Sequence, residues 1–225
     1  MNNLSKIGLG TVQFGIDYGV SNQQGKTSPA EVMKIFEIAA ANNITMIDTA
    51  STYGNSEEVI GVCLPTNSHF NVVTKSPLFN DVSPQDGKEY LIENFQKSLQ
   101  RLKLDKTYGL MIHHADDLLG PCSSGIIEGL HYLREHNLVK KIGFSFYSQE
   151  QAEKIMENFI PDIVQLPLNI FDQNFVDSGF LKQLKSNDIE IHVRSAFLQG
   201  LVFISPDNLD PYFDFAKEHI CKFHD

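Results

Sequence analysis

The 225-residue chain has few of the features that mark secreted, membrane-spanning or nucleic-acid-binding proteins. It contains only three cysteines, Cys63, Cys122 and Cys221, and they are widely spaced. An odd number of cysteines without paired ligand spacing fits free thiols in a reducing compartment better than a disulfide framework or a zinc site. No apolar run approaches the ~18 residues that indicate a transmembrane helix. The first ten residues, MNNLSKIGLG, lack the apolar segment of a secretory signal. We therefore expect a cytoplasmic protein without a membrane partner or a bound metal.

Positive charge is also scarce. The chain has 18 Lys and Arg against 28 Asp and Glu, which gives a net charge of −10. Nucleic-acid binding requires basic surfaces, so this balance argues against a nucleic-acid partner. It does not exclude a phosphate-bearing ligand, because a few basic groups and backbone N–H donors can hold one. Tryptophan is absent, but 16 Phe and 7 Tyr can fill a core. The length fits one domain, residues 1–225, since single barrels commonly reach ~250 residues.

Short apolar runs alternate with longer amphipathic stretches along the chain. The runs that predict strands are Ile7–Thr11, Thr45–Asp48, Asn71–Lys75, Tyr108–Ile112, Lys141–Ser145, Ile163–Leu166 and Glu190–Arg194. The stretches that predict helices are Pro29–Asn42, Glu89–Leu102, Ser124–His136, Gln149–Asn158 and Asp177–Ser186. Ser28 is the expected N-cap of the first helix, with Glu31 as its capping-box partner. The last stretch, after the seventh strand, predicts a loop and one helix.

Strict alternation of strand and helix implies a parallel sheet, which can be open or closed into a barrel. An open doubly wound sheet usually carries G-x-G-x-x-G after its first strand, and GLGTVQFG does not match that pattern. Polar residues instead follow the ends of successive strands, where a (β/α)8 barrel gathers its active site. We therefore predict an α/β fold, a (β/α)8 TIM-type barrel that is incomplete, with about seven βα units.

Four residues in the first half of the chain form a candidate catalytic group. They are Asp48, Tyr53, Lys75 and His113. A tyrosine with a pKa of ~10 is a poor acid at neutral pH, and a nearby ammonium lowers that pKa. Asp48 would keep Lys75 charged and placed, and a neutral His113 would orient a carbonyl oxygen. Each residue taken alone also has an ordinary reading as a turn residue, a loop aromatic or a strand-end charge.

Six segments in order carry a family resemblance. DTASTYGNSEEVIG, TKSP and YGLMIHHADDL resemble the parts of aldo-keto reductases that bring together aspartate, tyrosine, lysine and histidine. IGFSFYS, VQLPLNIFDQ and VRSAFLQGLV resemble later segments of that family, although Phe146 stands where an asparagine is usual. The resemblance is to bacterial members with short loops and extends from about Ile7 to about Leu201. Strand alternation allows only one of His113 and His114 to point inward, and the family pattern selects His113.

The resemblance implies reduction of an aldehyde, ketone or sugar-type carbonyl to an alcohol, with NADPH or NADH as cofactor and Tyr53 as general acid. Ser145 and Gln165 would hold the nicotinamide carboxamide, and Arg194 would stack on the ring. The full set of implied cofactor-binding residues is Gly10, Thr11, Asp48, Ser145, Gln165, Arg194, Ser195, Leu198 and Gly200. Phe79, Tyr147 and Phe171 are candidate walls of the substrate site. A small-molecule carbonyl compound is therefore the expected partner.

The resemblance also implies that an eighth βα unit would supply most contacts to the adenosine end of the cofactor. No eighth apolar strand is predicted here, so we expect two open sheet edges and possible self-association there. The alternative function is a weak or inactive homologue that serves as a ligand-binding or scaffold protein. A metal-dependent barrel hydrolase is disfavoured because no H-x-H pair follows the first strand.

Overall fold

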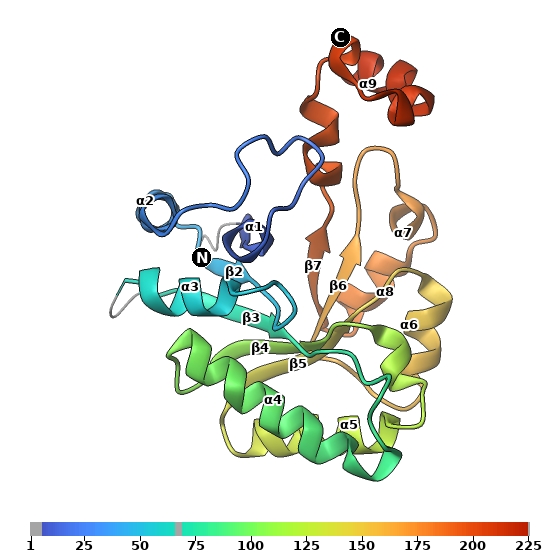
Figure 1. The fold of residues 1–225 in the computed structure, drawn as a ribbon. Coiled ribbons are helices and arrows are strands. Elements are labelled where there is room, and N and C mark those ends of the chain that lie inside the picture. Colours follow the sequence, from blue (N-terminus) through green and yellow to red (C-terminus); the bar gives the residue numbers. More distant parts are fainter. Residues whose placement is uncertain (1–5, 66–68, 225) are drawn as a thin grey trace.

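In the part of the chain that the structure describes, seven parallel strands form one sheet in the order of the sequence. The computed structural model describes residues 6–65 and 69–224 (Figure 1). The strands are β1 Gly8–Gly10, β2 Met46–Asp48, β3 Asn71–Lys75, β4 Thr107–Ile112, β5 Val139–Ser145, β6 Ile163–Pro167 and β7 Glu190–Arg194. The sheet curls into a half-barrel, so the predicted incomplete barrel of about seven βα units is confirmed.

Most of the helices between the strands cover the outer face of the half-barrel, and one further helix follows the last strand (Figure 1). They are α1 Val12–Gly15, α2 Pro29–Ala41, α3 Ser56–Cys63, α4 Gly87–Leu102, α5 Ser123–Glu135, α6 Gln149–Met156, α7 Asn174–Asp177, α8 Phe180–Ser186 and α9 Lys217–His224. After β7 the chain runs through short 3-10 segments into α9, which lies far from α4 and α5 in Figure 1. In the described parts of the chain, no helix is long and apolar enough to cross a membrane.

Several local features differ from the sequence-based predictions. The short helix α1 and the helix α3 were not predicted, and the polar start of α3 follows directly on a turn. The helix predicted over Asp177–Ser186 is broken into α7 and α8 at Gly179, whose φ of 76° is incompatible with a continuing helix. Ser28 caps α2 as predicted, by accepting a 3.3 Å hydrogen bond from the N–H of Glu31. The Glu31 carboxylate, however, pairs with Lys34 instead of completing the capping box.

The core lies mainly between the sheet and its helices. Alternate strand residues such as Leu110, Ile112 and Phe144 point outward and pack under α4 and α5, in the largest buried cluster. A second cluster lies under α2 and α3. The concave face holds a smaller group, built around Val73, Met111 and Ile163. Period-2 alternation in strands buried on both faces explains why each strand contributes apolar residues to both sides.

The two outer strands, β1 and β7, are less buried than the rest. Each pairs with one neighbour within residues 6–65 and 69–224, and neither contains a fully buried residue. Val193 of β7 is 46% exposed. Unpaired strand edges favour association with another chain. Self-association at this edge remains a prediction, and sedimentation velocity over a range of protein concentrations would test it.

A polar cluster closes the opposite end of the half-barrel, at the N-terminal ends of the strands. Glu190, the first residue of β7, accepts hydrogen bonds from the Tyr108 hydroxyl at 2.6 Å and from the Lys141 ammonium. The His192 ring lies 2.7 Å from the other carboxylate oxygen. Burial opposes ionisation of Glu190, but the hydrogen bonds from His192, Lys141 and Tyr108 outweigh it and lower the pKa of this carboxyl from 4.5 to about 2. The cluster therefore ties β4, β5 and β7 together.

We predict that Glu190→Gln lowers the free energy of unfolding at pH 7 by about 1–3 kcal/mol, because it leaves Lys141 without its carboxylate. The folded pKa is depressed, so this stabilisation is fully present above pH 4.5 and is lost as the pH falls toward 2. Urea unfolding at pH 7 and pH 3.5 should show a smaller difference between variant and wild type at the lower pH. Glu218→Gln, at an exposed ion pair on α9, is the matched control. An equal loss in both variants would contradict the prediction.

Candidate active site

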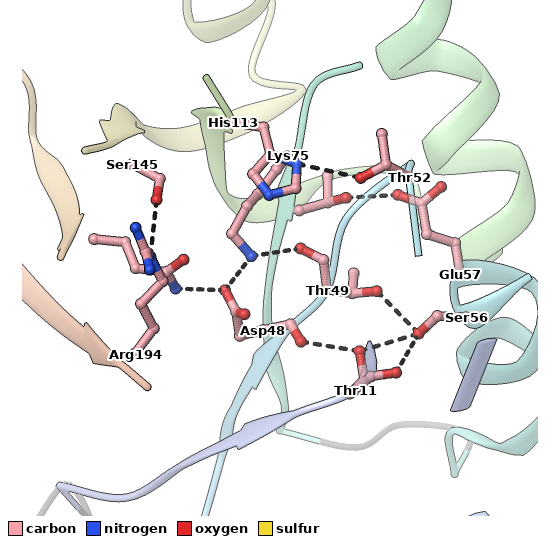
Figure 2. Close-up of polar contacts among 12 residues, drawn as sticks. Thr11, Asp48, Thr49, Thr52, Ser56, Glu57, Lys75, His113, Ser145 and Arg194 are labelled. Carbon is pink, nitrogen blue, oxygen red and sulfur yellow. Dashed lines mark hydrogen bonds and ion pairs between the residues drawn. The ribbon is translucent and has the colours of Figure 1, made fainter. Parts of the chain in front are cut away.

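Polar side chains from four strands gather at the C-terminal edge of the half-barrel. Asp48, Lys75, Ser145 and Arg194 are the last residues of β2, β3, β5 and β7, and His113 directly follows β4. All strands run in the same direction, so these ends meet at one edge of the sheet. Figure 2 shows the side chains converging there. The structure thus brings together residues that lie up to 146 positions apart in the sequence (194 − 48).

Lys75 and Asp48 form an ion pair at the centre of this edge. The Lys75 Nζ atom donates to Asp48 Oδ1 at 2.6 Å and to the Thr49 carbonyl oxygen at 2.9 Å. The Lys75 side chain is 0% exposed and that of Asp48 21% exposed. An ammonium so far from water must be paired, because an isolated buried charge is very costly. Asp48 Oδ1 also accepts from Gln165 Nε2 at 2.8 Å, so the pair is held by donors from two sides.

Tyr53 lies next to this pair, in the turn between β2 and α3. The Lys75 Nζ atom is 5.2 Å from the centroid of its ring. Burial raises the pKa of Tyr53 above 10.0, and although the Lys75 charge lowers it, the net direction is upward. The lowering influence expected of Lys75 is therefore present, but desolvation of the phenol, which the sequence does not show, outweighs it. Tyr53 consequently holds its proton at neutral pH.

His113 completes the group. Its ring meets the Tyr53 ring edge to face, with centroids 5.8 Å apart. Burial lowers the pKa of His113 to about 4, and the Lys75 charge adds to this effect. The imidazole is therefore neutral at pH 7 and can donate one N–H. His114 is exposed at the surface beside it, with ring centroids 5.0 Å apart. Of the two histidines, the geometry places His113 against Tyr53.

Two polar networks behind these residues were not predicted. The first network is centred on the hydroxyl of Ser56, at the start of α3. This hydroxyl lies within donating distance of two Thr11 atoms, the carbonyl oxygen at 2.9 Å and Oγ1 at 3.0 Å, and it lies 3.1 Å from the Thr49 hydroxyl. Thr11 donates in turn to the Asp48 carbonyl oxygen at 2.9 Å. All of these hydroxyls are buried. The network fixes the ends of β1 and β2 against α3, as Figure 2 shows.

The second network is centred on Glu57, which is 1% exposed. Its carboxylate accepts from Arg101 of α4 at 2.6 and 2.7 Å and from the hydroxyl of Thr74, the neighbour of Lys75, at 2.5 Å. Glu57 thus connects α3, α4 and β3 directly behind the lysine. In the sequence, Glu57 and Glu58 look equivalent, and only the register of α3 separates the buried residue from the exposed one.

The residues expected to hold the nicotinamide have protein partners in this structure. The Ser145 hydroxyl accepts from Arg194 Nε at 3.3 Å, and Gln165 donates to Asp48. Arg194 also donates to the Phe146 carbonyl oxygen at 3.3 Å, and its guanidinium lies 4.0 Å from the centroid of the Tyr147 ring. The Arg194 guanidinium therefore makes a cation–π contact with the Tyr147 ring.

The other residues that the resemblance implies for cofactor binding lie in two parts of the structure, at the end of β1 and after β7. Gly10 ends β1 beside open space, and the Thr11 side chain belongs to the buried hydroxyl network. After β7, Ser195, Leu198 and Gly200 have positive φ angles of 59°, 49° and 87°. A Cβ atom at Gly200 would lie 1.9 Å from the Ser21 hydroxyl, so a larger residue does not fit there without a shift. This sharply turned segment contacts the loop that follows α1.

The three residues predicted to line the substrate site differ in how far they are exposed. Phe79 is 4% exposed and packs in the main core against Tyr90, with ring centroids 5.1 Å apart, so its assignment as a wall is wrong. Tyr147 is 71% exposed and Phe171 is 40% exposed. These two aromatics remain candidates, because an exposed ring at the mouth can contact a ligand. Among the described residues there is no group of three or more side chains that could bind a metal ion.

The fold and this edge define a parallel α/β half-barrel with a buried lysine–aspartate pair beside a protonated tyrosine and a neutral histidine. The model of the Aldo/keto reductase family matches residues 6–223, and the chain belongs to that family. It is 24% identical over 202 residues to the uncharacterized oxidoreductase YcsN of Bacillus subtilis strain 168. The match covers 81% of this chain and 66% of that relative, slightly less than two thirds of its length.

Solved structures show the same fold. A Pseudomonas aeruginosa structure assigned to the aldo-keto reductases has a TM-score of 0.72 and 25% identity, over 88% of this chain and 76% of its own. An aldo-keto reductase of Bombyx mori, solved in complex with NADP, has a TM-score of 0.62 and 23% identity. That match covers 84% of this chain and 62% of the silkworm protein. At 23% identity, the similarity to the Bombyx mori structure shows a shared fold and nothing further.

Proposed function

We propose that this protein is an NAD(P)H-dependent oxidoreductase that reduces a small aldehyde, ketone or sugar-type carbonyl to an alcohol, with Tyr53 as general acid. The observation that carries the proposal is the completely buried Lys75 ammonium, paired with Asp48 at 2.6 Å and 5.2 Å from the Tyr53 ring. A buried cation next to a phenol stabilises the phenolate that proton donation leaves behind. Ionisable side chains with shifted pKa values that face one another at the C-terminal end of a barrel are typical of catalytic sites.

Each residue has a distinct part in the proposed reaction. A bound nicotinamide cofactor would supply the hydride that the carbonyl carbon gains. Tyr53 donates its hydroxyl proton to the carbonyl oxygen, so that the alcohol and a tyrosine phenolate result. The oxygen that gains the hydride's charge is a much stronger base than a phenolate, so the raised pKa of Tyr53 does not prevent this transfer. Lys75 stabilises the phenolate until solvent returns a proton, and neutral His113 donates a hydrogen bond to the substrate oxygen.

The residues at the mouth fit a nicotinamide cofactor on two observations. The side-chain carbonyl oxygen of Gln165 accepts no hydrogen bond from any residue that the structure describes, so it can accept from a carboxamide. Gly10 faces open space at the end of β1. Ser145 would hold the same carboxamide, the planar guanidinium of Arg194 would stack on the ring, and the turned segment at Ser195, Leu198 and Gly200 would follow the pyrophosphate. A protein of the same fold from Bombyx mori was solved in complex with NADP, so this cofactor class is the one to test first.

A two-part experiment tests the function. Quenching or enhancement of NADPH and NADH fluorescence on titration gives the dissociation constant of each cofactor. Loss of NADPH absorbance is then followed with a panel of small aliphatic, aromatic and sugar-type aldehydes and ketones. The proposal expects saturable cofactor binding and turnover of at least one carbonyl class. Saturable binding without turnover of any carbonyl would instead support an inactive ligand-binding homologue, and absence of both would refute the cofactor assignment.

A further inference from the structure

One tight turn carries both Tyr53 and a residue with no assigned role, Thr52. The Tyr53 N–H donates to the Ala50 carbonyl oxygen at 3.1 Å, which closes the turn. The Ser51 N–H donates to the Lys75 carbonyl oxygen at 3.1 Å, which fixes the turn to the end of β3. Thr52 is therefore held by backbone contacts on both sides, although its side chain is exposed at the mouth of the half-barrel.

The Thr52 hydroxyl contacts the candidate histidine. Its Oγ1 atom lies 3.2 Å from His113 Nδ1, as Figure 2 shows. The His113 main chain is also fixed, because its N–H donates to the Ser76 hydroxyl at 3.3 Å. The two residues are 61 positions apart, and the contact exists because the ends of β2 and β4 face each other across β3. Across residues 6–65 and 69–224, Nε2 of His113 has no hydrogen-bond partner.

The contact decides where the imidazole carries its hydrogen. A neutral histidine has one N–H, on Nδ1 or on Nε2, and the other nitrogen accepts. A hydroxyl can donate or accept, so the Thr52 contact is compatible with both forms. Only when Thr52 donates to Nδ1 does Nε2 carry the hydrogen. In the opposite form Nε2 would present a lone pair, and two acceptors would face each other when a carbonyl oxygen approached.

We propose that Thr52 is a positioning residue whose hydroxyl donates to Nδ1 of His113 and holds the imidazole in the form that carries its hydrogen on Nε2. The inference rests on the proposed function in one respect, namely that Nε2–H then donates to the substrate carbonyl oxygen. The partner of one ring nitrogen commonly sets the role of the other. The neutral state of His113, which burial and Lys75 maintain, makes this choice of form necessary. The turn at residues 50–53 thus supplies the proposed acid, Tyr53, and also orients the second hydrogen-bond donor, His113.

Histidine side-chain NMR tests the assignment without any need for activity. The chain has eight histidines, so the His113 signals are identified as those lost in His113→Gln. Correlation of ring ¹⁵N and ¹H signals then shows which nitrogen is protonated at pH 7. The proposal expects Nε2–H for His113 in the wild type and a mixture of both forms in Thr52→Val. This variant keeps the branched shape but removes the hydroxyl, and Thr52→Ser should restore the wild-type pattern.

Kinetics supply the second readout. Thr52→Val should lower kcat/KM for carbonyl reduction by about tenfold, as expected for one lost hydrogen bond, while Thr52→Ser recovers most of it. NADPH affinity and melting temperature should stay at wild-type values, because Thr52 is exposed and its side chain makes no other hydrogen bond within the residues that the structure describes. A wild-type His113 with its hydrogen on Nδ1, or an unchanged pattern in Thr52→Val, would overturn the proposal. If the NMR result holds but no carbonyl is reduced, Thr52 keeps its assignment and only the proposed function fails.

Discussion

Replacement of Tyr53 by phenylalanine is expected to lower the rate of carbonyl reduction by about 10²- to 10⁴-fold, the range of general-acid catalysis. The substitution removes only the hydroxyl. The ring can keep its edge-to-face contact with His113 at 5.8 Å, and the turn is closed by a backbone hydrogen bond that does not involve the side chain. Steady-state kinetics with the best carbonyl of the panel would measure the loss.

The same variant should bind NADPH nearly as tightly as the wild type, because the hydroxyl acts on the substrate oxygen. Tyr132→Phe is a matched control on α5, where the tyrosine ring stacks on His136 away from the strand ends. It should keep full activity. A Tyr53→Phe protein that reduces the test carbonyl at the wild-type rate would show that another group donates the proton, and the assignment of the four residues would then be wrong.

The order of strands and helices could be predicted from the sequence, because strands appear as short apolar runs and helices as longer amphipathic stretches. The strands β3 and β7 begin and end where the apolar runs do. The predictions failed where a polar residue interrupts the pattern. Helix α3 begins with Ser56, Glu57 and Glu58, which resemble a loop until Glu57 is seen to be buried against Arg101. The break at Gly179 was missed because one glycine in an amphipathic stretch is tolerated in many helices.

The sequence predicts which residues form the candidate site, but it predicts their contacts and pKa values only in part. Residues at strand ends converge by topology, so Asp48, Lys75 and His113 could be placed together from their order alone. Contacts that depend on a particular turn, such as the hydroxyl of Thr52 on His113, leave no sequence signal. The net direction of the Tyr53 pKa was also inaccessible, because it is a balance between burial and the Lys75 charge, and sequence reveals only the charge.

The second large effect is expected for Lys75→Met. Methionine can replace the buried stem of the lysine, but the variant loses the charge that stabilises the Tyr53 phenolate. We expect a fall in kcat across the whole pH range. The apparent pKa of the acid should rise, because the lowering influence of Lys75 on Tyr53 is gone. Reduction requires protonated Tyr53, so the alkaline limb of the kcat/KM profile should move to higher pH. Lys34→Met, at an exposed ion pair on α2, is the matched control.

Loss of the ammonium also affects stability, and this effect must be separated from catalysis. Among the hydrogen bonds of the described residues, the Asp48 side chain would keep only the one from Gln165. We expect a loss of about 1–3 kcal/mol in the free energy of unfolding, less than for a fully buried unpaired charge, because Asp48 retains contact with water. The double variant Lys75→Met/Asp48→Asn removes both charges. It should regain much of the stability and none of the activity.

Asp48→Asn alone should change the pH profile in the same direction as Lys75→Met but more weakly, because Asp48 acts on Tyr53 mainly by holding Lys75. Its ammonium partner keeps the Thr49 carbonyl oxygen as acceptor at 2.9 Å, so some charge remains near the phenol. If the pH–rate profiles of Lys75→Met and Asp48→Asn both match the wild type, the lysine does not tune the acid. The buried ion pair would then serve only to join β2 and β3.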